Sequence, residues 1–480
     1  MSSLRGCSVV LIQPPDPVPA ATAVDSGGGV SLRFSPPWDL LCLRAFLLNR
    51  TSHPCRIVDT RLFDQFETKL KDALRDIAKP AVAVIPVQTT GLGEASAVID
   101  VLHRNYPDML IVTCGQHPSD FPELALSLPH VRYALCGDPE PILRNLLDYH
   151  DIERRLHLTP GLASAGNPVP QPYWLPDLRS LNVADWTHLD WAGYASASPA
   201  GLRADIRLSR GHPRSPADVA SGQSAQPLRE WPLDRAAAMI QRCAHHGIVE
   251  VFLGDSPGYW TEQRLIAWSK QLITLRSTQA WSAQILPRML SENALNFLFD
   301  SRCRRMEILF PSCDPERLKT AGALHEPAKI AAAIATIRKA NIDVNLRFWV
   351  GGPHERPRER DRILAMIRLL DDCPYFLYPY PYEPTAPVFQ TEDSPVLASA
   401  GIQQWLSWAK EPWLAERPTA FWSGKEGADA CQQVILDVQR KVHLNPGRRL
   451  RKTLRHLRSI DWIVAWERRA LALFAKRLES

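Results

Sequence analysis

The 480-residue sequence lacks several patterns that would assign a function at once. It has ten cysteines but no Cys-x-x-Cys pair, so the ligand spacing of zinc ribbons and dithiol redox motifs is absent. No apolar run approaches the ~20 residues that a membrane-spanning helix needs. The net charge is only +5, from 56 basic and 51 acidic residues, which does not indicate a nucleic-acid partner. No secretory leader pattern opens the sequence, and free cysteines without one predict the cytoplasm.

The overall composition is typical of a large globular protein. Hydrophobic residues make up 45% and charged residues 22% of the chain, which is the ordinary range. The length allows two or three domains with well-filled cores. The 41 prolines are scattered along the chain, which indicates turns and loops.

The first 150 residues alternate short apolar runs with amphipathic stretches. The expected strands are 8–13, 56–59, 81–87, 109–114 and 131–136. This alternation predicts an α/β domain, a doubly wound parallel Rossmann-like sheet with helices on both faces. Ligands of such sheets lie beyond the carboxyl ends of the strands. The polar turns that follow these runs are therefore the expected binding rim.

The remainder of the chain divides into three further regions. Residues 151–200 are rich in Pro, Trp and Asp without a clear period and are expected to form an ordered linker. Residues 201–395 resume the alternation, with strands expected at 204–209, 249–253, 280–285, 305–310, 343–350 and 375–380. Six such units predict a partial (β/α)6 barrel of the TIM type. Residues 396–480 lose the strand pattern and are expected to form a C-terminal helical cap.

The most informative segment is 209–219, which reads Ser-Arg-Gly-His-Pro-Arg-Ser-Pro-Ala-Asp-Val. It resembles the cluster loop of cobalamin-binding radical S-adenosylmethionine enzymes, where the pattern is Ser-Arg-Gly-Cys-Pro-x-x-Cys-x-Phe-Cys. The three cysteine positions are occupied by His212, Pro216 and Val219. Thiolates hold iron–sulfur clusters, and neither proline nor valine can ligate iron. The chain therefore resembles a degenerate member of this family, without the Cys-x3-Cys-x2-Cys motif.

Other segments resemble the same family in the same order over about 400 residues. They include Val-Val-Leu-Ile-Gln-Pro-Pro at 9–15, Gly-Gln-His-Pro-Ser at 115–119, Cys-Gly-Asp-Pro-Glu at 136–140, Lys-Ala-Asn-Ile-Asp-Val at 339–344 and Pro-Tyr-Pro-Tyr-Glu-Pro-Thr at 379–385. The resemblance implies a cobalamin-binding domain at 1–150 and a radical-SAM-like partial barrel at 201–395. In active members, a reduced cluster cleaves S-adenosylmethionine, and methylcobalamin delivers a methyl group.

The resemblance and the strand-end turns together predict a cobalamin rim. Its residues are Gln88, Thr89, Thr90, Gly91, Gly115, His117, Gly137 and Glu140. Hydroxyls, an amide and backbone donors at such a rim suit the corrin amides and the nucleotide tail, and Gly115 would permit close backbone approach. Binding of S-adenosylmethionine stays open. A [4Fe–4S] cluster is not expected, and no other set of metal ligands is predicted.

Several residues have more than one interpretation. Asp255 is the candidate catalytic residue, because its carboxylate could accept a hydrogen bond from an amino group of a bound nucleoside or methionine; a helix N-cap is the alternative. His117 is either a cobalt contact or an orienting residue, and His212 is either a lone metal ligand or a polar loop residue. Cys243 and His246 share a helix face three residues apart, but they make only half of a zinc site.

Three functions are compatible with a chain that keeps the family-like segments but lacks the cluster ligands. The first is a cobalamin-binding, radical-SAM-like protein that serves an active radical SAM or other biosynthetic enzyme as a noncatalytic or non-radical partner. The second is a cobalamin-dependent methyltransferase that works without radicals. The third is a pure protein-interaction scaffold. Whether the chain is an enzyme, and which small molecule it would act on, stays open because fold alone does not decide function.

Overall fold

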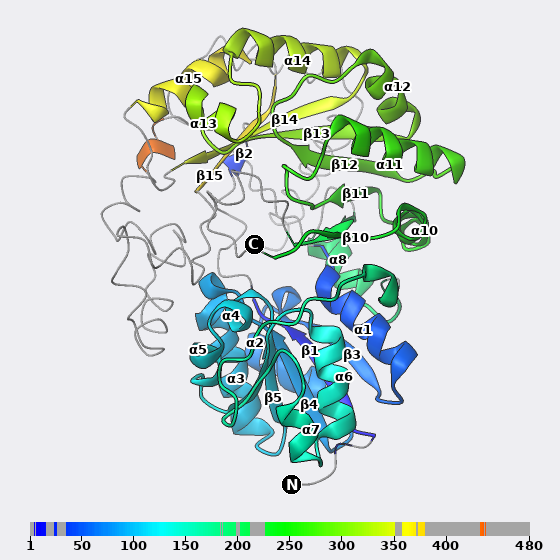
Figure 1. Cartoon of the computed structure of the whole chain (residues 1–480), viewed down its shortest axis with the longest axis vertical. Helices are drawn as coiled ribbons and strands as arrows, with labels where there is room; N and C mark the ends of the chain where they lie inside the picture. Colours follow the sequence, from blue (N-terminus) through cyan, green and yellow to red (C-terminus); the bar gives the residue numbers. More distant parts are fainter. Residues whose placement is uncertain are drawn as a thin grey trace, which may run out of the picture.

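The computed structural model describes residues 4, 6–15, 24–25, 35–182, 184, 186–197, 202–211, 226–350, 358–370, 373–379, 433–435 and 437. Two largely parallel sheets occupy the two ends of the molecule, with their connecting segment between them (Figure 1). The positions of the three missing cluster ligands, and nearly all of 396–480, lie outside the described residues. No helix within the described ranges is long and apolar enough to cross a bilayer.

The first sheet has the strand order β3-β1-β4-β5-β6-β7. Its strands are β1 (Ser8–Gln13), β3 (Cys55–Asp59), β4 (Ala81–Pro86), β5 (Leu110–Cys114), β6 (Val131–Leu135) and β7 (Leu162–Ala163). The first five run parallel, and the short β7 is antiparallel to β6. From β1 the chain passes to β3 on one side, and from β3 it crosses to β4 on the other side of β1. The switch point of this doubly wound sheet therefore lies between β1 and β4.

Helices cover both faces of the first sheet, which explains its nearly continuous apolar strands. The helices are α1 (Trp38–Arg50), α2 (Phe66–Leu74), α3 (Leu92–Asn105), α4 (Gln116–Asp120), α5 (Pro122–Leu126), α6 (Pro139–Tyr149) and α7 (Glu153–His157). Along β1, Val9 and Leu11 belong to the core that contains α1 and α6, whereas Val10 and Ile12 belong to the core that contains α2 and α3. This alternation is the period of two expected of a strand buried on both faces.

The second sheet has the order β2-β15-β14-β13-β12-β11-β8. Its strands are β8 (Arg203–Ile206), β11 (Glu250–Leu253), β12 (Ala280–Ile285), β13 (Cys303–Phe310), β14 (Asp343–Val350), β15 (Tyr375–Pro379) and β2 (Val24–Asp25). The six strands from β8 to β15 are parallel and follow chain order, and β2 adds an antiparallel edge to β15. In the described part of the chain no pairing joins β8 to β15, so the sheet is open.

The outer face of the second sheet is covered by helices on the side away from the first sheet (Figure 1). The helices that follow its strands are α10 (Leu233–Ala244), α11 (Glu262–Thr274), α12 (Glu292–Asp300), α13 (Pro315–Thr320), α14 (Pro327–Lys339) and α15 (Glu359–Leu369). The inner face is polar. Glu307 on β13 is buried there, and its carboxylate pairs with Arg347 on β14 at 2.5 Å and lies 3.9 Å from Arg203 on β8.

The segment between the sheets packs through aromatic side chains against the helical layer of each of them. Trp186 lies 6.1 Å from Trp38 of α1, measured between ring centroids. Trp191, at the start of α8 (Trp191–Ala197), stacks on His246 just beyond α10 at 4.8 Å. Such aromatic pairs add to the stability gained from their buried area. The linker is thus packed against its neighbours on both sides where it is described.

One expected strand is interrupted. The sequence predicted a strand over 204–209, but β8 ends at Ile206, and Ser209–Arg210 form β9, which pairs with β10 (Arg229–Glu230). The cause lies far along the chain. The carboxylate of Asp255 accepts hydrogen bonds from the amides of Leu208 and Ser209, which turns the backbone away from the β11 ladder.

Candidate functional site

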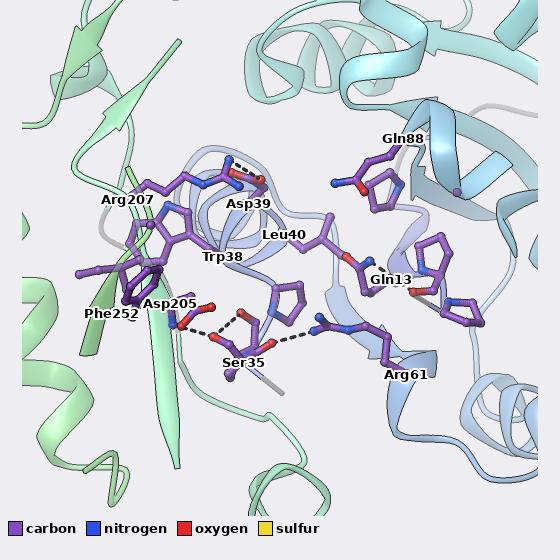
Figure 2. A pocket seen from close by; sticks show the side chains of 18 residues that line it. Gln13, Ser35, Trp38, Asp39, Leu40, Arg61, Gln88, Asp205, Arg207 and Phe252 are labelled. Carbon is purple, nitrogen blue, oxygen red and sulfur yellow. Dashed lines mark hydrogen bonds and ion pairs between the residues drawn. The ribbon is translucent and has the colours of Figure 1, made fainter. Parts of the chain in front are cut away.

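A cavity with two lobes lies where the carboxyl ends of the first sheet face the second. The first lobe, about 400 Å³, is open at the β1–β4 switch point. Gln13, Arg61 and Gln88 line it from the first sheet, and Asp205 and Phe252 line it from the second (Figure 2). A crevice at this point is where ligands bind in open α/β sheets.

The second lobe, about 460 Å³, lies beyond β4, β5 and β6. The first sheet contributes the turns at Gly115 and Gly137, and the linker contributes Trp174. Gln284 from β12 and Trp349 from β14 line the opposite side. The lobe therefore combines two indole rings with amide and backbone groups, a mixture suited to a large amphipathic ligand.

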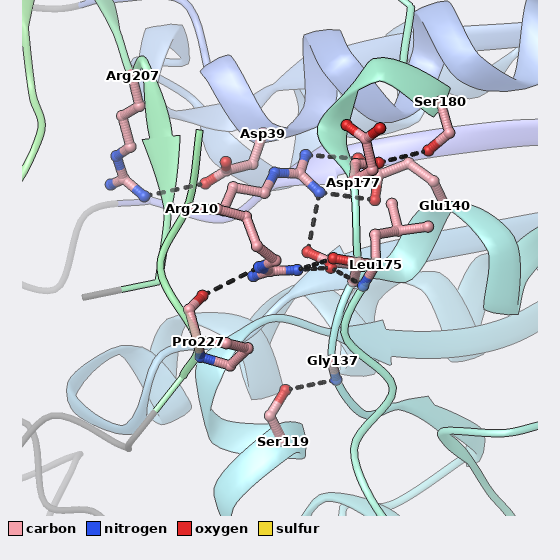
Figure 3. A network of polar contacts seen from close by, with 12 residues as sticks. Asp39, Ser119, Gly137, Glu140, Leu175, Asp177, Ser180, Arg207, Arg210 and Pro227 are labelled. Carbon is pink, nitrogen blue, oxygen red and sulfur yellow. Dashed lines mark hydrogen bonds and ion pairs between the residues drawn. The ribbon is translucent and has the colours of Figure 1, made fainter. Parts of the chain in front are cut away.

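An ion pair lies where the two lobes meet. Asp39 in the first turn of α1 and Arg207 after β8 approach to 3.7 Å, and both residues line both lobes. Figures 2 and 3 show the pair reaching from one structural unit to the other. Both side chains are more than half exposed, so the pair contributes little to stability and is a contact that a ligand could replace.

The predicted rim residues divide into two groups. Gln88 and Gly91 line the first lobe, and Gln88, Gly115 and Gly137 line the second. Three predicted residues line neither lobe: Thr89, His117 and Glu140. The side chain of Thr90 lies outside the described part of the structure. Cofactor binding by the first group stays a prediction.

His117 supports the rim from within the protein. Its ring is fully buried, and its Nδ1 lies 3.1 Å from Oγ1 of Thr89, which is also buried. Burial lowers the pKa of His117 to about 3, so the imidazole is neutral at physiological pH. Of its two interpretations, this placement favours the orienting role over direct contact with a cobalt ion.

The two rim glycines are required by the protein backbone itself. Gly115 has φ +101°, and a Cβ there would lie 3.2 Å from the carbonyl oxygen of Val87. Gly137 has φ +108°, and its Cβ would lie 2.1 Å from the carbonyl oxygen of Tyr173 in the linker. Glycine is the only residue that avoids both the strain and the clash at Gly137. The close approach that the sequence suggested for a ligand at Gly115 is made by protein backbone.

Asp255 is not a helix N-cap, because the following helix begins at Glu262 and is capped by Thr261. Its buried carboxylate accepts hydrogen bonds from the amides of Leu208 and Ser209 and from the hydroxyl of Ser209. Burial raises its pKa to about 6, against the lowering effect of these hydrogen bonds. The residue lines the second lobe, but its oxygens are engaged in holding the turn before β9.

Glu140 lies in a buried ion-pair network and not at the rim. Its carboxylate accepts two hydrogen bonds from Arg210, at 2.9 and 2.5 Å, across the boundary between the two units (Figure 3). Arg210 also donates to Asp138 at 3.0 Å. In the sequence, Arg210 resembles the arginine of a cluster-binding loop. In the structure, its guanidinium group joins β9 to Asp138 and Glu140 of the first unit.

The cysteines are dispersed and buried. The nine described cysteines are all free thiols, and burial raises the pKa of Cys7 to about 11 and that of Cys136 to about 12. Within the described ranges, no three His, Cys, Asp or Glu side chains are grouped as a metal site requires. The sequence placed Cys243 and His246 on one helix face, but α10 ends at Ala244; the Cys243 thiol packs in the core, while the His246 imidazole stacks on Trp191.

The sequence offered no signal for several residues that shape the cavity. Trp174 and Trp349 come from segments without a recognisable motif, and the Asp39–Arg207 pair joins residues that are far apart in the chain. Arg229, whose guanidinium group donates a hydrogen bond to Asp138, was likewise not identified. The lining residues that carried a local pattern are the polar turn at Gln88, the rim glycines, the Ser-Arg-Gly segment at 209–211 and Asp255.

Comparisons with known proteins identify the fold. No protein-family model matches the sequence, and no curated protein matches it either. Among solved structures, the chain is similar to the radical S-adenosylmethionine methyltransferase TsrM from Kitasatospora setae with cobalamin and a [4Fe–4S] cluster bound. That similarity has a TM-score of 0.62 and 15% identity over 83% of this chain and 81% of TsrM. TsrM with tryptophan and a SAM analogue bound gives a TM-score of 0.60 and 16% identity over 75% and 71% of the two chains.

A second enzyme has the same fold. The cobalamin-dependent S-adenosylmethionine radical enzyme OxsB, with aqua-cobalamin bound, gives a TM-score of 0.57 at 14% identity. The similarity covers 77% of this chain and 53% of OxsB, so the matched region is about half of that protein. The fold of this chain is therefore that of cobalamin-dependent radical SAM enzymes.

Proposed function

We propose that this chain is a cobalamin-binding, radical-SAM-like protein that has lost its iron–sulfur cluster and serves a biosynthetic enzyme as a noncatalytic or non-radical partner. In this proposal the first sheet is the cobalamin-binding unit, and the second is a partial (β/α)6 barrel. The observation that carries the proposal is a two-lobed cavity at the switch point, combined with a loop at 209–219 that contains no thiolate.

The residues around the cavity fit a corrinoid. The side-chain amides of Gln88 and Gln116 lie on the rim, exposed and half-buried respectively. Primary amides can donate to and accept from the amide groups that surround a corrin. The indoles of Trp174, from the linker, and Trp349, from β14, supply apolar surface in the second lobe. These side chains would hold and orient the cofactor, while the second sheet would exclude water from it.

The residues do not fit a [4Fe–4S] cluster. His212, Pro216 and Val219 occupy the ligand positions, and among the described residues no three His, Cys, Asp or Glu side chains are grouped as a metal site requires. Bound cobalamin would supply a cobalt centre able to carry a methyl group, and nothing in the cluster loop would supply the electron for radical cleavage of S-adenosylmethionine.

The arrangement of Asp255 favours the partner role over a surviving non-radical methyltransferase. A general base needs an oxygen within hydrogen-bond reach of the substrate proton. Both carboxylate oxygens of Asp255 already accept from Leu208, and one also accepts from Ser209. The carboxylate therefore holds the turn at 208–209, which is a structural role.

The test is to purify the chain anaerobically with hydroxocobalamin supplied, then record the visible spectrum and measure cobalt and iron. We expect a corrinoid spectrum with equimolar cobalt and no iron. A Gln88→Trp variant should lose cobalt, because Gln88 lines both lobes and an indole there would occupy the space of the ligand. Gln263→Trp, at an exposed position on α11, is the matched control and should retain it. Bound iron, or cleavage of S-adenosylmethionine, would contradict the proposal, and absence of both metals would favour a protein-interaction scaffold.

A further inference from the structure

The hairpin formed by β9 and β10 carries two arginines directly opposite each other. Arg210 on β9 is the register partner of Arg229 on β10 in an antiparallel pair. Both guanidinium groups are almost completely buried. Like charges directly opposite on neighbouring strands destabilise the pair. The two strands that flank the segment 212–225 therefore need counter-charges from elsewhere in order to form a hairpin.

The counter-charges come from Asp138, which precedes α6, and from Glu140 in the first turn of α6. Asp138 accepts a hydrogen bond from each arginine, one at each carboxylate oxygen. Glu140 accepts two from Arg210 (Figure 3). Both carboxylates are nearly or fully buried, so each guanidinium is matched by a carboxylate in a region of low dielectric, where paired charges interact strongly.

The same aspartate also fixes the linker. Its carboxylate accepts a hydrogen bond from the amide of Leu175 at 2.6 Å, and its own amide donates to the carbonyl oxygen of Tyr173 at 2.8 Å. Arg229 donates to the carbonyl oxygen of Leu175 at 3.1 Å, and its guanidinium carbon lies 5.4 Å from the centre of the Trp174 ring. Three segments remote in sequence thus meet at Asp138.

These segments form one wall of the second lobe. Six residues from these segments line the lobe: Gly137, Asp138, Trp174, Ser209, Arg210 and Gly211. We infer that Asp138 and Glu140 are positioning residues, which hold the β9–β10 hairpin and Trp174 in place to shape the second lobe. The consequence for ligand affinity rests on the proposed function, whereas the docking of the hairpin does not.

The first experiment measures hydrogen exchange of the full, ligand-free chain. In Asp138→Asn we expect faster exchange in peptides that cover 173–176, 208–211 and 226–231, because one neutral amide replaces the charge shared by two arginines. The Leu175 amide and the β9–β10 ladder are the bonds that report this. Peptides from β1 and β4 should be unchanged. Asp177→Asn, at an exposed position in the same linker, is the control and should leave all three peptides unchanged.

A conservative variant separates a positioning role from general destabilisation. Glu140→Gln should loosen 208–211, and Glu140→Asp, which keeps the charge, should restore part of the protection. Unchanged exchange in Asp138→Asn, or faster exchange spread evenly over both sheets, would overturn the inference.

The second experiment titrates hydroxocobalamin into the same variants. We expect affinity to fall at least about tenfold in Asp138→Asn and to stay unchanged in Asp177→Asn, since loss of one partner of a buried charge pair is costly. Equal affinity in the two variants would overturn the inference. If the parent chain itself fails to bind cobalamin, the proposed function fails, and hydrogen exchange still decides the role of Asp138.

Discussion

The hydroxyl of Ser209 donates a hydrogen bond of 2.6 Å to Oδ1 of Asp255, forty-six residues further along the chain. The amide of Ser209 reaches the same oxygen at 2.8 Å, and the amide of Leu208 lies 3.0 Å from both carboxylate oxygens. One buried side chain in the turn after β11 thus interrupts the strand that began as β8. Ser209 and Arg210, which resemble residues of a cluster-binding loop, are each held by carboxylates. Neither arrangement requires a metal.

Replacing Asp255 by asparagine tests this link through the pH dependence of stability. Burial raises the pKa of the carboxyl from its ordinary 3.8 to about 6. Between these values the folded state holds a proton that the unfolded state has released, so stability from this group falls as the pH rises from about 4 to about 6. The fall amounts to at most about 3 kcal/mol. Asp255→Asn should abolish it, measured as the melting temperature across this range.

The control for that measurement is Asp234→Asn, which removes an exposed carboxyl in the first turn of α10. It should reproduce the pH profile of the parent chain. If Asp255→Asn also reproduces the parent profile, the carboxylate is not desolvated as the structure indicates, and its role as a buried clamp is wrong.

The strands were largely predictable because their burial on both faces produces apolar runs that are visible in the sequence. The expected ranges 8–13, 280–285 and 343–350 coincide with β1, β12 and β14. The interruption between β8 and β9 was not predictable, because its cause is a carboxylate that only the folded chain brings to Leu208. The short β2 and β7 have two residues each, too few to show a period.

The candidate site was predictable only in part, for a related reason. The turn after a strand can be located from the sequence, which is why Gln88 and Gly115 do line the cavity. The direction in which a side chain of that turn points depends on the residue with which it forms a hydrogen bond or ion pair. Glu140 points to Arg210, and His117 to Thr89, and no local pattern connects residues that are so far apart.

Gly137 should be the least replaceable glycine of the rim. A Cβ at this position would lie 2.1 Å from the Tyr173 carbonyl oxygen in a backbone conformation with φ +108°. Gly137→Ala should destabilise the chain by about 3 kcal/mol or more, because strain and overpacking add. Gly247→Ala is the matched control: it has φ +72° with nothing within 4 Å, so it should cost about 1 kcal/mol. Equal shifts in the denaturation midpoint would refute the close approach of the linker.

The native thiols should be unreactive and unable to assemble a cluster. The nine described cysteines are buried, and only thiolates react readily or bind iron. Cys431 lies outside the described residues, so the test uses Cys431→Ala. We expect no rapid reaction with Ellman's reagent in the native state, full reaction of nine thiols in guanidinium chloride, and no iron after anaerobic reconstitution with iron and sulfide.

A positive control for the cluster experiment restores the missing ligands. The variant with His212→Cys, Pro216→Cys and Val219→Cys has the family spacing and should take up iron with the broad visible absorbance of a thiolate-held cluster. Iron uptake by Cys431→Ala alone would show that dispersed cysteines converge in a way the structure does not display. That result would contradict the proposal of a cluster-free protein.

His117 should have the opposite effect on acid stability from Asp255. Burial lowers the pKa of His117 from 6.5 to about 3, so between these values the unfolded state binds a proton that the folded state excludes. Stability from this residue is complete above pH 6.5 and falls as the pH decreases, by at most about 5 kcal/mol. His117→Gln keeps an amide that can bond Thr89 but cannot be protonated in this range, so its melting temperature should fall less between pH 6.5 and 4.5. His245→Gln, at an exposed position beyond α10, should match the parent.

The two buried groups oppose each other between about pH 4 and 6. Asp255→Asn should therefore steepen the loss of stability on acidification, and His117→Gln should flatten it. Shifts in the same direction would show that at least one of the two side chains is solvated.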